Sequence, residues 1–84
     1  MVKKEADVRL ENGLEARPVA LLVQVASQYD SQIYIENRGR RVNAKSIMGM
    51  MTLVLAANDH VIISADGPDE EAAATAVAVY LEGR

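Results

Sequence analysis

The fold of this 84-residue chain is decided by the stretch Gln32-Ile33-Tyr34-Ile35-Glu36-Asn37-Arg38-Gly39-Arg40-Arg41-Val42-Asn43-Ala44. Apolar and polar residues alternate on both sides of the turn Asn37-Arg38-Gly39. A short turn that contains glycine, set between two alternating runs, predicts an antiparallel hairpin of residues 32–36 and 40–44. The residues expected to face inward are Ile33, Ile35, Val42 and Ala44.

Two further segments, Glu5–Leu10 and His60–Ala65, alternate in the same way. Each is therefore expected to be a strand with one apolar and one polar face. The turn at Asn58-Asp59 precedes the second of these strands. Their inward-facing residues are expected to be Ala6, Val8, Leu10, Val61, Ile63 and Ala65.

The segments between the predicted strands show the spacing of apolar residues that is typical of helices. In the segment Ala16–Ser27, apolar residues recur at spacings of three, four and seven, and Pro18 suits a first helical turn. Ser46 is placed to N-cap a short helix from Ile47 to about Leu53. The inward stripe of the first helix is expected to comprise Val19, Leu22, Val23 and Ala26.

A last helix is expected after Gly67-Pro68-Asp69, which ends the preceding strand and caps the helix. The acidic pair Glu70-Glu71 suits the positive end of the helix dipole. Its inward stripe is expected to comprise Ala73, Ala76, Val77, Tyr80 and Leu81.

The predicted order is β-α-β-β-α-β-α. Because every strand has one apolar and one polar face, we expect an α+β open-faced β-sandwich, a four-stranded antiparallel sheet with three helices on one face. No repeat, linker or low-complexity stretch divides the chain, so residues 1–84 are interpreted as a single domain.

Composition narrows the functional classes. The chain has no cysteine, which excludes disulfides and thiolate metal sites, and we expect neither a metal site nor a cofactor. It shows no signal-peptide pattern and no apolar run near the roughly 20 residues that span a bilayer, so a cytoplasmic protein without membrane contact is expected. A net charge of −3 argues against direct nucleic-acid binding. The basic cluster Arg38, Arg40 and Arg41 beside Lys45 is either a solvated hairpin end or a docking patch for an acidic partner or a phosphate.

Two motifs carry a resemblance. They are Gly13-Leu14-Glu15-Ala16-Arg17-Pro18 and Val42-Asn43-Ala44-Lys45-Ser46-Ile47-Met48-Gly49. Together they resemble HPr, the phosphocarrier of the bacterial sugar phosphotransferase system, and the resemblance extends over essentially the full chain. It implies the HPr fold, which matches the fold expected from periodicity.

The resemblance places Glu15 where the family carries a phosphorylated histidine. An imidazole nitrogen is a good nucleophile near neutral pH, and a helix N-terminus with an arginine can hold its phosphoryl group. A carboxylate does not replace that nitrogen in the ordinary way, so no catalytic residue is expected. Glu15 is interpreted as a partner for Arg17 or a weak imitation of phosphohistidine, and Arg17 as its partner or a contact to a docking protein. The one histidine, His60, is expected to be a surface or capping residue.

Ser46 lies within the second motif. Its simple interpretation is an N-cap, and the resemblance implies a second role, phosphorylation by the ATP-dependent HPr kinase/phosphorylase. Ile47, Met48 and Met51 cannot all face the core from one short helix. They are interpreted either as packing residues or as an apolar docking surface beside Ser46.

A chain that lacks the histidine and keeps the Ser46 motif resembles the catabolite-repression branch of the HPr family. This implies a non-enzymatic corepressor that, when phosphorylated on Ser46, binds a catabolite control protein of the LacI/GalR type. Glu15 departs from the neutral polar residue, such as glutamine, that is expected at this position in that branch.

Two other functions stay open. One is a phosphocarrier whose histidine is replaced by Glu15. The other is an acylphosphatase-like enzyme that uses Arg17 and Asn43, although neither residue sits in that family's motif. The protein is expected to be a monomer, with a homodimer by strand exchange as the alternative, because Glu11-Asn12-Gly13 offers a short flexible hinge.

Overall fold

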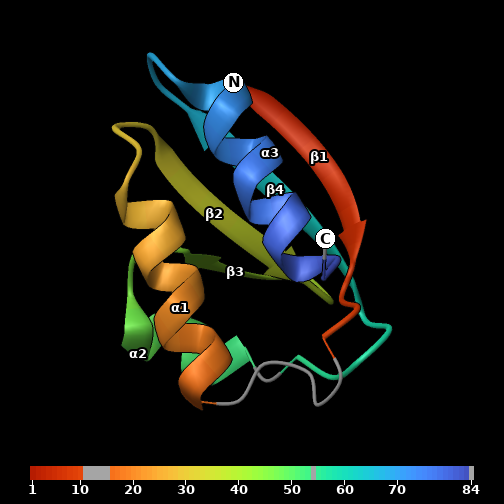
Figure 1. The fold of residues 1–84 in the computed structure, drawn as a ribbon. Helices are drawn as coiled ribbons and strands as arrows, with labels where there is room; N and C mark the ends of the chain where they lie inside the picture. Colours follow the sequence, from red (N-terminus) through yellow and green to blue (C-terminus); the bar gives the residue numbers. More distant parts are fainter. Residues whose placement is uncertain (11–15, 54, 84) are drawn as a thin grey trace.

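A computed structural model describes residues 1–10, 16–53 and 55–83. Its elements follow the predicted order (Figure 1). They are β1 (Val2–Asp7), α1 (Ala16–Ser27), β2 (Gln32–Asn37), β3 (Arg40–Asn43), α2 (Ile47–Leu53), β4 (His60–Asp66) and α3 (Glu70–Leu81).

The four strands form one antiparallel sheet in the order β1-β4-β2-β3. All three helices lie on one face of this sheet, and the other face is open (Figure 1). The expected open-faced α+β architecture is therefore confirmed. It places β1 at one edge of the sheet and β3 at the other.

The β2–β3 hairpin closes through two residues, Arg38 and Gly39. Their φ angles are 54° and 78°, the pattern of a type I′ turn, whose twist matches that of the flanking strands. Asn37 therefore belongs to β2, which is one residue longer than predicted. Its side-chain amide donates a hydrogen bond to the carbonyl of His60 at 2.8 Å and ties the hairpin to the start of β4.

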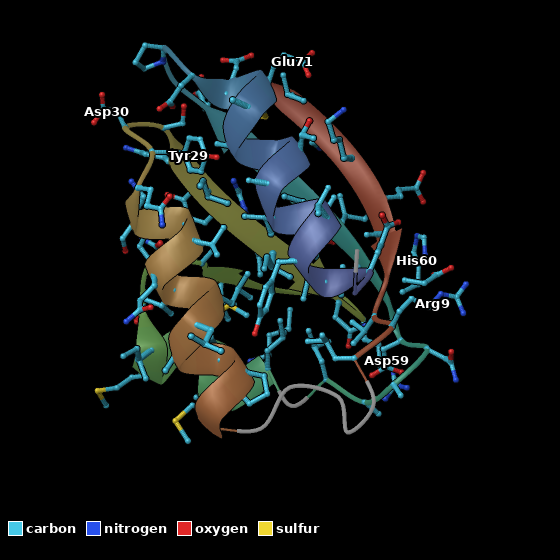
Figure 2. All side chains as sticks on the ribbon, in the orientation of Figure 1. Arg9, Tyr29, Asp30, Asp59, His60 and Glu71 are labelled. Atoms are coloured by element: carbon cyan, nitrogen blue, oxygen red, sulfur yellow. The ribbon has the colours of Figure 1, made fainter. Side chains whose placement is uncertain are left out.

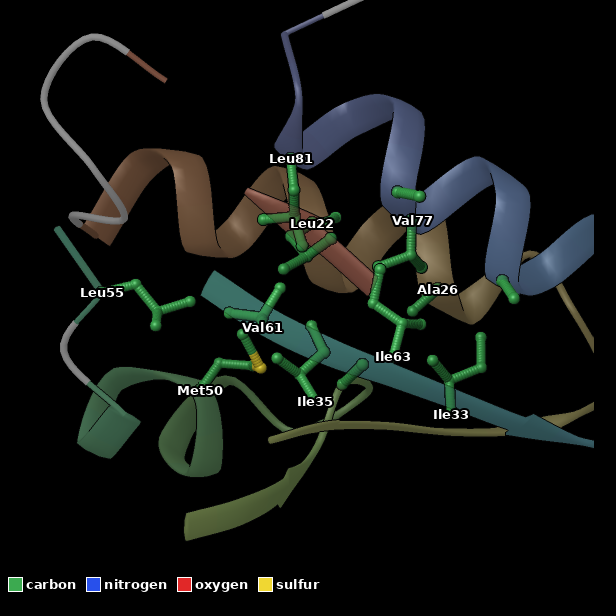
Figure 3. Packing of buried hydrophobic residues seen from close by; sticks show 14 of the residues in the cluster. Leu22, Ala26, Ile33, Ile35, Met50, Leu55, Val61, Ile63, Val77 and Leu81 are labelled. Carbon is green, nitrogen blue, oxygen red and sulfur yellow. The ribbon is translucent and has the colours of Figure 1, made fainter. Parts of the chain in front are cut away.

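The core lies between the sheet and the helices (Figure 3). The chain has no phenylalanine or tryptophan, so aliphatic side chains fill this space. The largest fully buried ones include Leu22, Ile33, Ile35, Met50, Ile63 and Leu81. The inward residues predicted for β2 and β4 are all buried, and Val42 of β3 packs against the core while partly exposed.

Two expectations about this core are corrected. The first strand runs from Val2 to Asp7 instead of residues 5–10, because its partner strand begins at His60, which pairs with Asp7. The strand starts before Lys3 and Lys4, and these two consecutive charged residues interrupt the alternation of apolar and polar residues from which the strand was predicted. Val8 nevertheless stays fully buried, since its backbone bonds to the turn at 58–59.

The inward face of α3 is also rotated relative to the prediction. Ala74 and Ala78 are buried, whereas Ala76 and Tyr80 are only partly buried. The helix packs on the sheet and on α1 at once, so the direction of its buried face is set by both neighbours. Its small side chains allow it to approach both.

Candidate functional site

Ser46 initiates α2. Its Oγ accepts a hydrogen bond from the backbone N–H of Gly49 at 3.1 Å, which is the expected N-cap geometry. Its carbonyl also accepts from the N–H of Met50 at 2.9 Å. The prediction that Ser46 caps this helix is confirmed.

The residues before Ser46 form hydrogen bonds that stabilise the start of α2. The side-chain oxygen of Asn43 accepts from the backbone N–H of Lys45 at 2.8 Å. The Lys45 ammonium donates to the carbonyl of Tyr29, just after α1, at 2.6 Å. The motif that precedes Ser46 thus joins β3, α2 and the end of α1, and it holds the serine at a fixed place on the surface.

The helix after Ser46 has two different faces. Met50 and Leu53 point into the core, with exposed fractions of 1% and 6%. Ile47, Met48 and Met51 point outward, with exposed fractions of 48%, 82% and 51%. We call these three residues the α2 apolar surface. They do not pack in the core, so the packing interpretation of these side chains is wrong.

The first motif leads into α1, whose backbone starts at Ala16 as predicted. Glu15 lies outside the described residues, and so does the side chain of Arg17. The first turn of α1 is tied to α3, because the Tyr80 hydroxyl donates a hydrogen bond to the carbonyl of Pro18 at 2.9 Å. Burial raises the pKa of this tyrosine. The structure therefore positions the start of α1 relative to α3, and the predicted roles of Glu15 and of the Arg17 side chain stay predictions.

His60 is exposed, as expected, and lies across the molecule from α1 and α2 (Figure 2). Its Nδ1 lies 2.9 Å from Oδ1 of Asp7, and its Nε2 lies 2.7 Å from Oε1 of Glu5. These contacts, first to Asp7 and then to Glu5, raise the pKa of His60, and the contact with His60 lowers the pKa of Asp7. Sequence reasoning missed this cluster because 53 and 55 residues separate the partners.

Two of the three hairpin arginines, Arg38 and Arg41, have partners within the protein. Arg38 pairs with Asp59 at 3.5 Å. The guanidinium of Arg41 lies 4.1 Å from the centre of the Tyr34 ring on the open face of the sheet. Both therefore have partners within the protein, which favours the solvated hairpin end over a docking patch.

Within the described ranges, no group of three or more His, Cys, Asp or Glu side chains is arranged to hold a metal ion. None of the helices in those ranges is long and apolar enough to cross a membrane.

The described geometry matches that of known proteins. Residues 2–83 match the family described as PTS HPr component phosphorylation site. The chain belongs to the HPr family. HPr-like protein Crh of Halalkalibacterium halodurans is 44% identical over 82 residues, which is 98% of each chain. Phosphocarrier protein HPr of Borreliella burgdorferi is 43% identical over 82 residues, 98% of this chain and 95% of that one.

Solved structures of the family agree closely with this fold. A crystal structure of HPr-C-His from Thermoanaerobacter tengcongensis superposes with a TM-score of 0.93 at 43% identity, covering 99% of this chain and 93% of that one. The crystal structure of Bacillus subtilis Crh, described as an intertwined dimer with a swapping domain, gives a TM-score of 0.80 at 43% identity and covers 99% and 95%. Proteins of both the phosphocarrier and the Crh kind are thus about equally similar, and individual residues must decide between them.

Proposed function

We propose that this protein is a regulatory member of the HPr family and does not carry a phosphoryl group on histidine. Phosphorylation of Ser46 by HPr kinase/phosphorylase would make it a corepressor of a LacI/GalR-type catabolite control protein in carbon catabolite repression. The observation that carries this proposal is the missing active histidine. Glu15 stands at the position of the family's phosphohistidine, and the single histidine of the chain, His60, lies elsewhere.

His60 is a poor substitute for the missing phosphohistidine. It lies on the side of the sheet away from α1, and both of its ring nitrogens contact carboxylates. A phosphoryl group there would face two negative charges and lack a helix N-terminus to hold it. The chain therefore offers no nitrogen suited to the family's phosphotransfer.

Ser46 is well suited to modification. It is partly exposed, and its hydroxyl is fixed by Gly49 at the start of α2. A phosphate would add a charge of about −1.5 to −2 where backbone N–H groups and the helix dipole favour it. The switch would change the surface charge while the fold persists.

The α2 apolar surface supports a role for this serine in partner binding. Ile47, Met48 and Met51 follow Ser46 directly, and methionines in exposed positions adapt well to a partner. We infer that the repressor and the kinase contact Glu15, Arg17, Ser46 and these three residues. In this proposal the partner reads the DNA, and this chain does not.

Phosphorylation by the kinase tests the proposal. Wild type, Ser46→Ala and the control Ser27→Ala are incubated with ATP and HPr kinase/phosphorylase, and their intact masses are measured. Ser27 is an exposed serine at the end of α1. One phosphate on wild type and on Ser27→Ala, with none on Ser46→Ala, supports the proposal. Absence of phosphate from all three proteins would remove its main support.

The phosphocarrier remains the second candidate, because the Borreliella burgdorferi relative named as one is 43% identical. In this case Glu15→His should restore phosphoryl transfer from the histidine-phosphorylating enzyme of the system to a sugar permease component. Robust transfer by wild type itself would overturn the regulatory proposal.

We also propose that the chain forms a homodimer by strand exchange. Structures described as a swapped, intertwined dimer of Bacillus subtilis Crh and as a dimer of Thermoanaerobacter tengcongensis HPr support this, each at 43% identity. Size exclusion over a wide concentration range tests it, and a monomer under all conditions would contradict it.

A further inference from the structure

The edge strand β1 is held to the rest of the sheet by β4. Six residue pairs connect them, from Val2 opposite Ala65 to Asp7 opposite His60. On the core face, Ala6 is buried and Lys4 reaches Glu71 of α3 at 3.7 Å. On the open face, the side chain of His60 bridges two residues of β1.

This bridge has the geometry of a doubly protonated imidazole. The two ring nitrogens lie 2.9 Å and 2.7 Å from carboxylate oxygens of Asp7 and Glu5. An ionised carboxylate only accepts hydrogen bonds, and a neutral imidazole has one donor. Neutral His60 would therefore set one nitrogen lone pair against a carboxylate oxygen, and only the imidazolium satisfies both contacts.

We propose that His60 is a proton-dependent clip that holds β1 against β4, so that loss of its proton makes the release of β1 easier. A strand that is released in this way is available to a second copy of the chain. This last step rests on the homodimer proposed above, whereas the clip itself does not.

Other charges around His60 do not replace it. Arg9 lies 3.4 Å from Asp7 and donates to Oδ1 of Asn58, in the turn before β4, at 3.2 Å. An arginine stays charged over the whole pH range of interest, so this link does not change when His60 loses its proton. Arg38 of the hairpin pairs with Asp59. On β2, Glu36 lies across Ile62 from Glu5, and it adds negative charge to the same face.

The direction of the effect follows from the two states of the strand. With β1 in place, contacts to Asp7 and Glu5 raise the pKa of His60 above its ordinary value of 6.5. With β1 released, these contacts are lost and the pKa returns towards that value. The clip therefore acts fully below pH 6.5, as long as the carboxylates stay ionised, and is lost as the pH rises through the folded-state pKa.

Amide hydrogen exchange of the monomer tests the clip. Protection of β1 amides, divided by that of β2 amides as an internal reference, is measured at about pH 5.5 and about pH 8.5. We compare wild type with His60→Gln and Asp7→Asn. The control is Asp30→Asn, the same chemical change in an exposed turn away from β1 (Figure 2).

At the lower pH, His60→Gln and Asp7→Asn should each reduce the relative protection of β1 by about 1.4- to fivefold, the range measured for exposed ion pairs. At the higher pH, His60→Gln should match wild type, and Asp30→Asn should match it throughout. An equal loss from His60→Gln at both values, or none at either, would overturn the clip.

The homodimer has a separate readout. Isotope-labelled and unlabelled protein are mixed at high concentration, and native mass spectrometry follows the mixed dimer. Faster exchange at the higher pH in wild type, but not in His60→Gln, is expected. A complete absence of dimer would overturn the strand exchange while leaving the result on the clip intact.

Discussion

The buried hydroxyl of Ser31 donates a hydrogen bond to Oδ1 of Asp69 at 2.5 Å, across 38 residues of sequence. The same carboxylate accepts from the backbone N–H groups of Asp30 and Ser31 at 2.9 Å and 3.0 Å. Asp69 occupies the N-cap position of α3 but makes no side-chain bond to that helix. It instead holds the start of β2 against the start of α3.

Removal of the Ser31 hydroxyl should weaken this link. Ser31→Ala is expected to lower the free energy of unfolding by about 0.5–1.5 kcal/mol, because one hydrogen bond to a buried group is lost while two backbone donors remain. Urea denaturation measures the change. Ser27→Ala, the removal of an exposed hydroxyl, should stay within about 0.5 kcal/mol of wild type. Equal effects of the two variants would contradict the assigned role.

The same link should depend on pH. Hydrogen bonds from Ser31 and then from the Asp30 backbone lower the pKa of Asp69 below its ordinary value of 3.8. A carboxyl with a lowered pKa stabilises the folded state above its unfolded pKa, and this contribution is lost as the pH falls through the folded pKa. The stability difference between wild type and Ser31→Ala should therefore be largest above about pH 5 and shrink in acid. A constant difference down to acid unfolding would show that the charge of Asp69 is not involved.

Gly67 allows Ser31 and Asp69 to meet. A Cβ at this position would lie 2.6 Å from the Cα and 2.7 Å from the Oγ of Ser31, so backbone would have to move. Gly67→Ala should therefore destabilise the protein by about 1–3 kcal/mol, as overpacking does. Thermal and urea unfolding measure it.

A second glycine provides the matched comparison. Gly39 has a positive φ of 78° but open space around its Cβ position, so Gly39→Ala reports the backbone strain alone, about 1–2 kcal/mol. Combining each variant with Ser31→Ala separates the two cases. The cost of Gly67→Ala should change in that background, because the clashing hydroxyl is gone, and the cost of Gly39→Ala should not.

Local patterns predicted most of the fold. The bounds of α1 and α2 agree with the spacing of apolar residues and with the Ser46 cap, and the hairpin follows from its glycine turn. These features depend on residues a few positions apart. The link between Ser31 and Asp69 and the cluster of His60 with its carboxylates depend on chain segments that meet only after folding, so no local pattern reveals them.

The candidate site was predicted to a lesser extent. The position of Ser46 and its role as N-cap could be predicted from its motif. The exposure of Met48 and Met51 could be predicted because α2 is too short for all of its apolar side chains to face the core. The role of Glu15 was inferred from a family resemblance, because a carboxylate in isolation has no chemistry that marks its position. Its contacts, together with those of the Arg17 side chain, lie outside the part of the chain that the structure describes.

The cap made by Ser46 predicts how its variants fold. Ser46→Ala loses the bond to the Gly49 N–H and should lower the free energy of unfolding by about 1 kcal/mol. Ser46→Asp keeps a capping oxygen and should remain close to wild type. Urea denaturation distinguishes these outcomes. Greater stability of Ser46→Ala would show that the cap is not important to α2.

Substitutions of two methionines on α2, Met50 and Met48, should distinguish side chains that stabilise the fold from side chains that bind a partner. Met50→Ala removes a side chain that is 1% exposed and should lower the free energy of unfolding by about 2–5 kcal/mol. Met48→Ala removes one that is 82% exposed and should change it by less than about 0.5 kcal/mol. Chemical denaturation of both variants checks this difference.

Met48→Ala, which should hardly change the free energy of unfolding, should reduce the affinity for the repressor. If the α2 apolar surface receives the repressor, Met48→Ala in the Ser46-phosphorylated protein should weaken binding about 5-fold or more, the loss of one well-buried interface side chain. Calorimetry measures the affinity, with exposed Leu21→Ala of α1 as the control for loss of an apolar side chain outside this surface. Unchanged affinity of Met48→Ala would place the docking surface elsewhere, because the stability of this variant excludes unfolding as a cause.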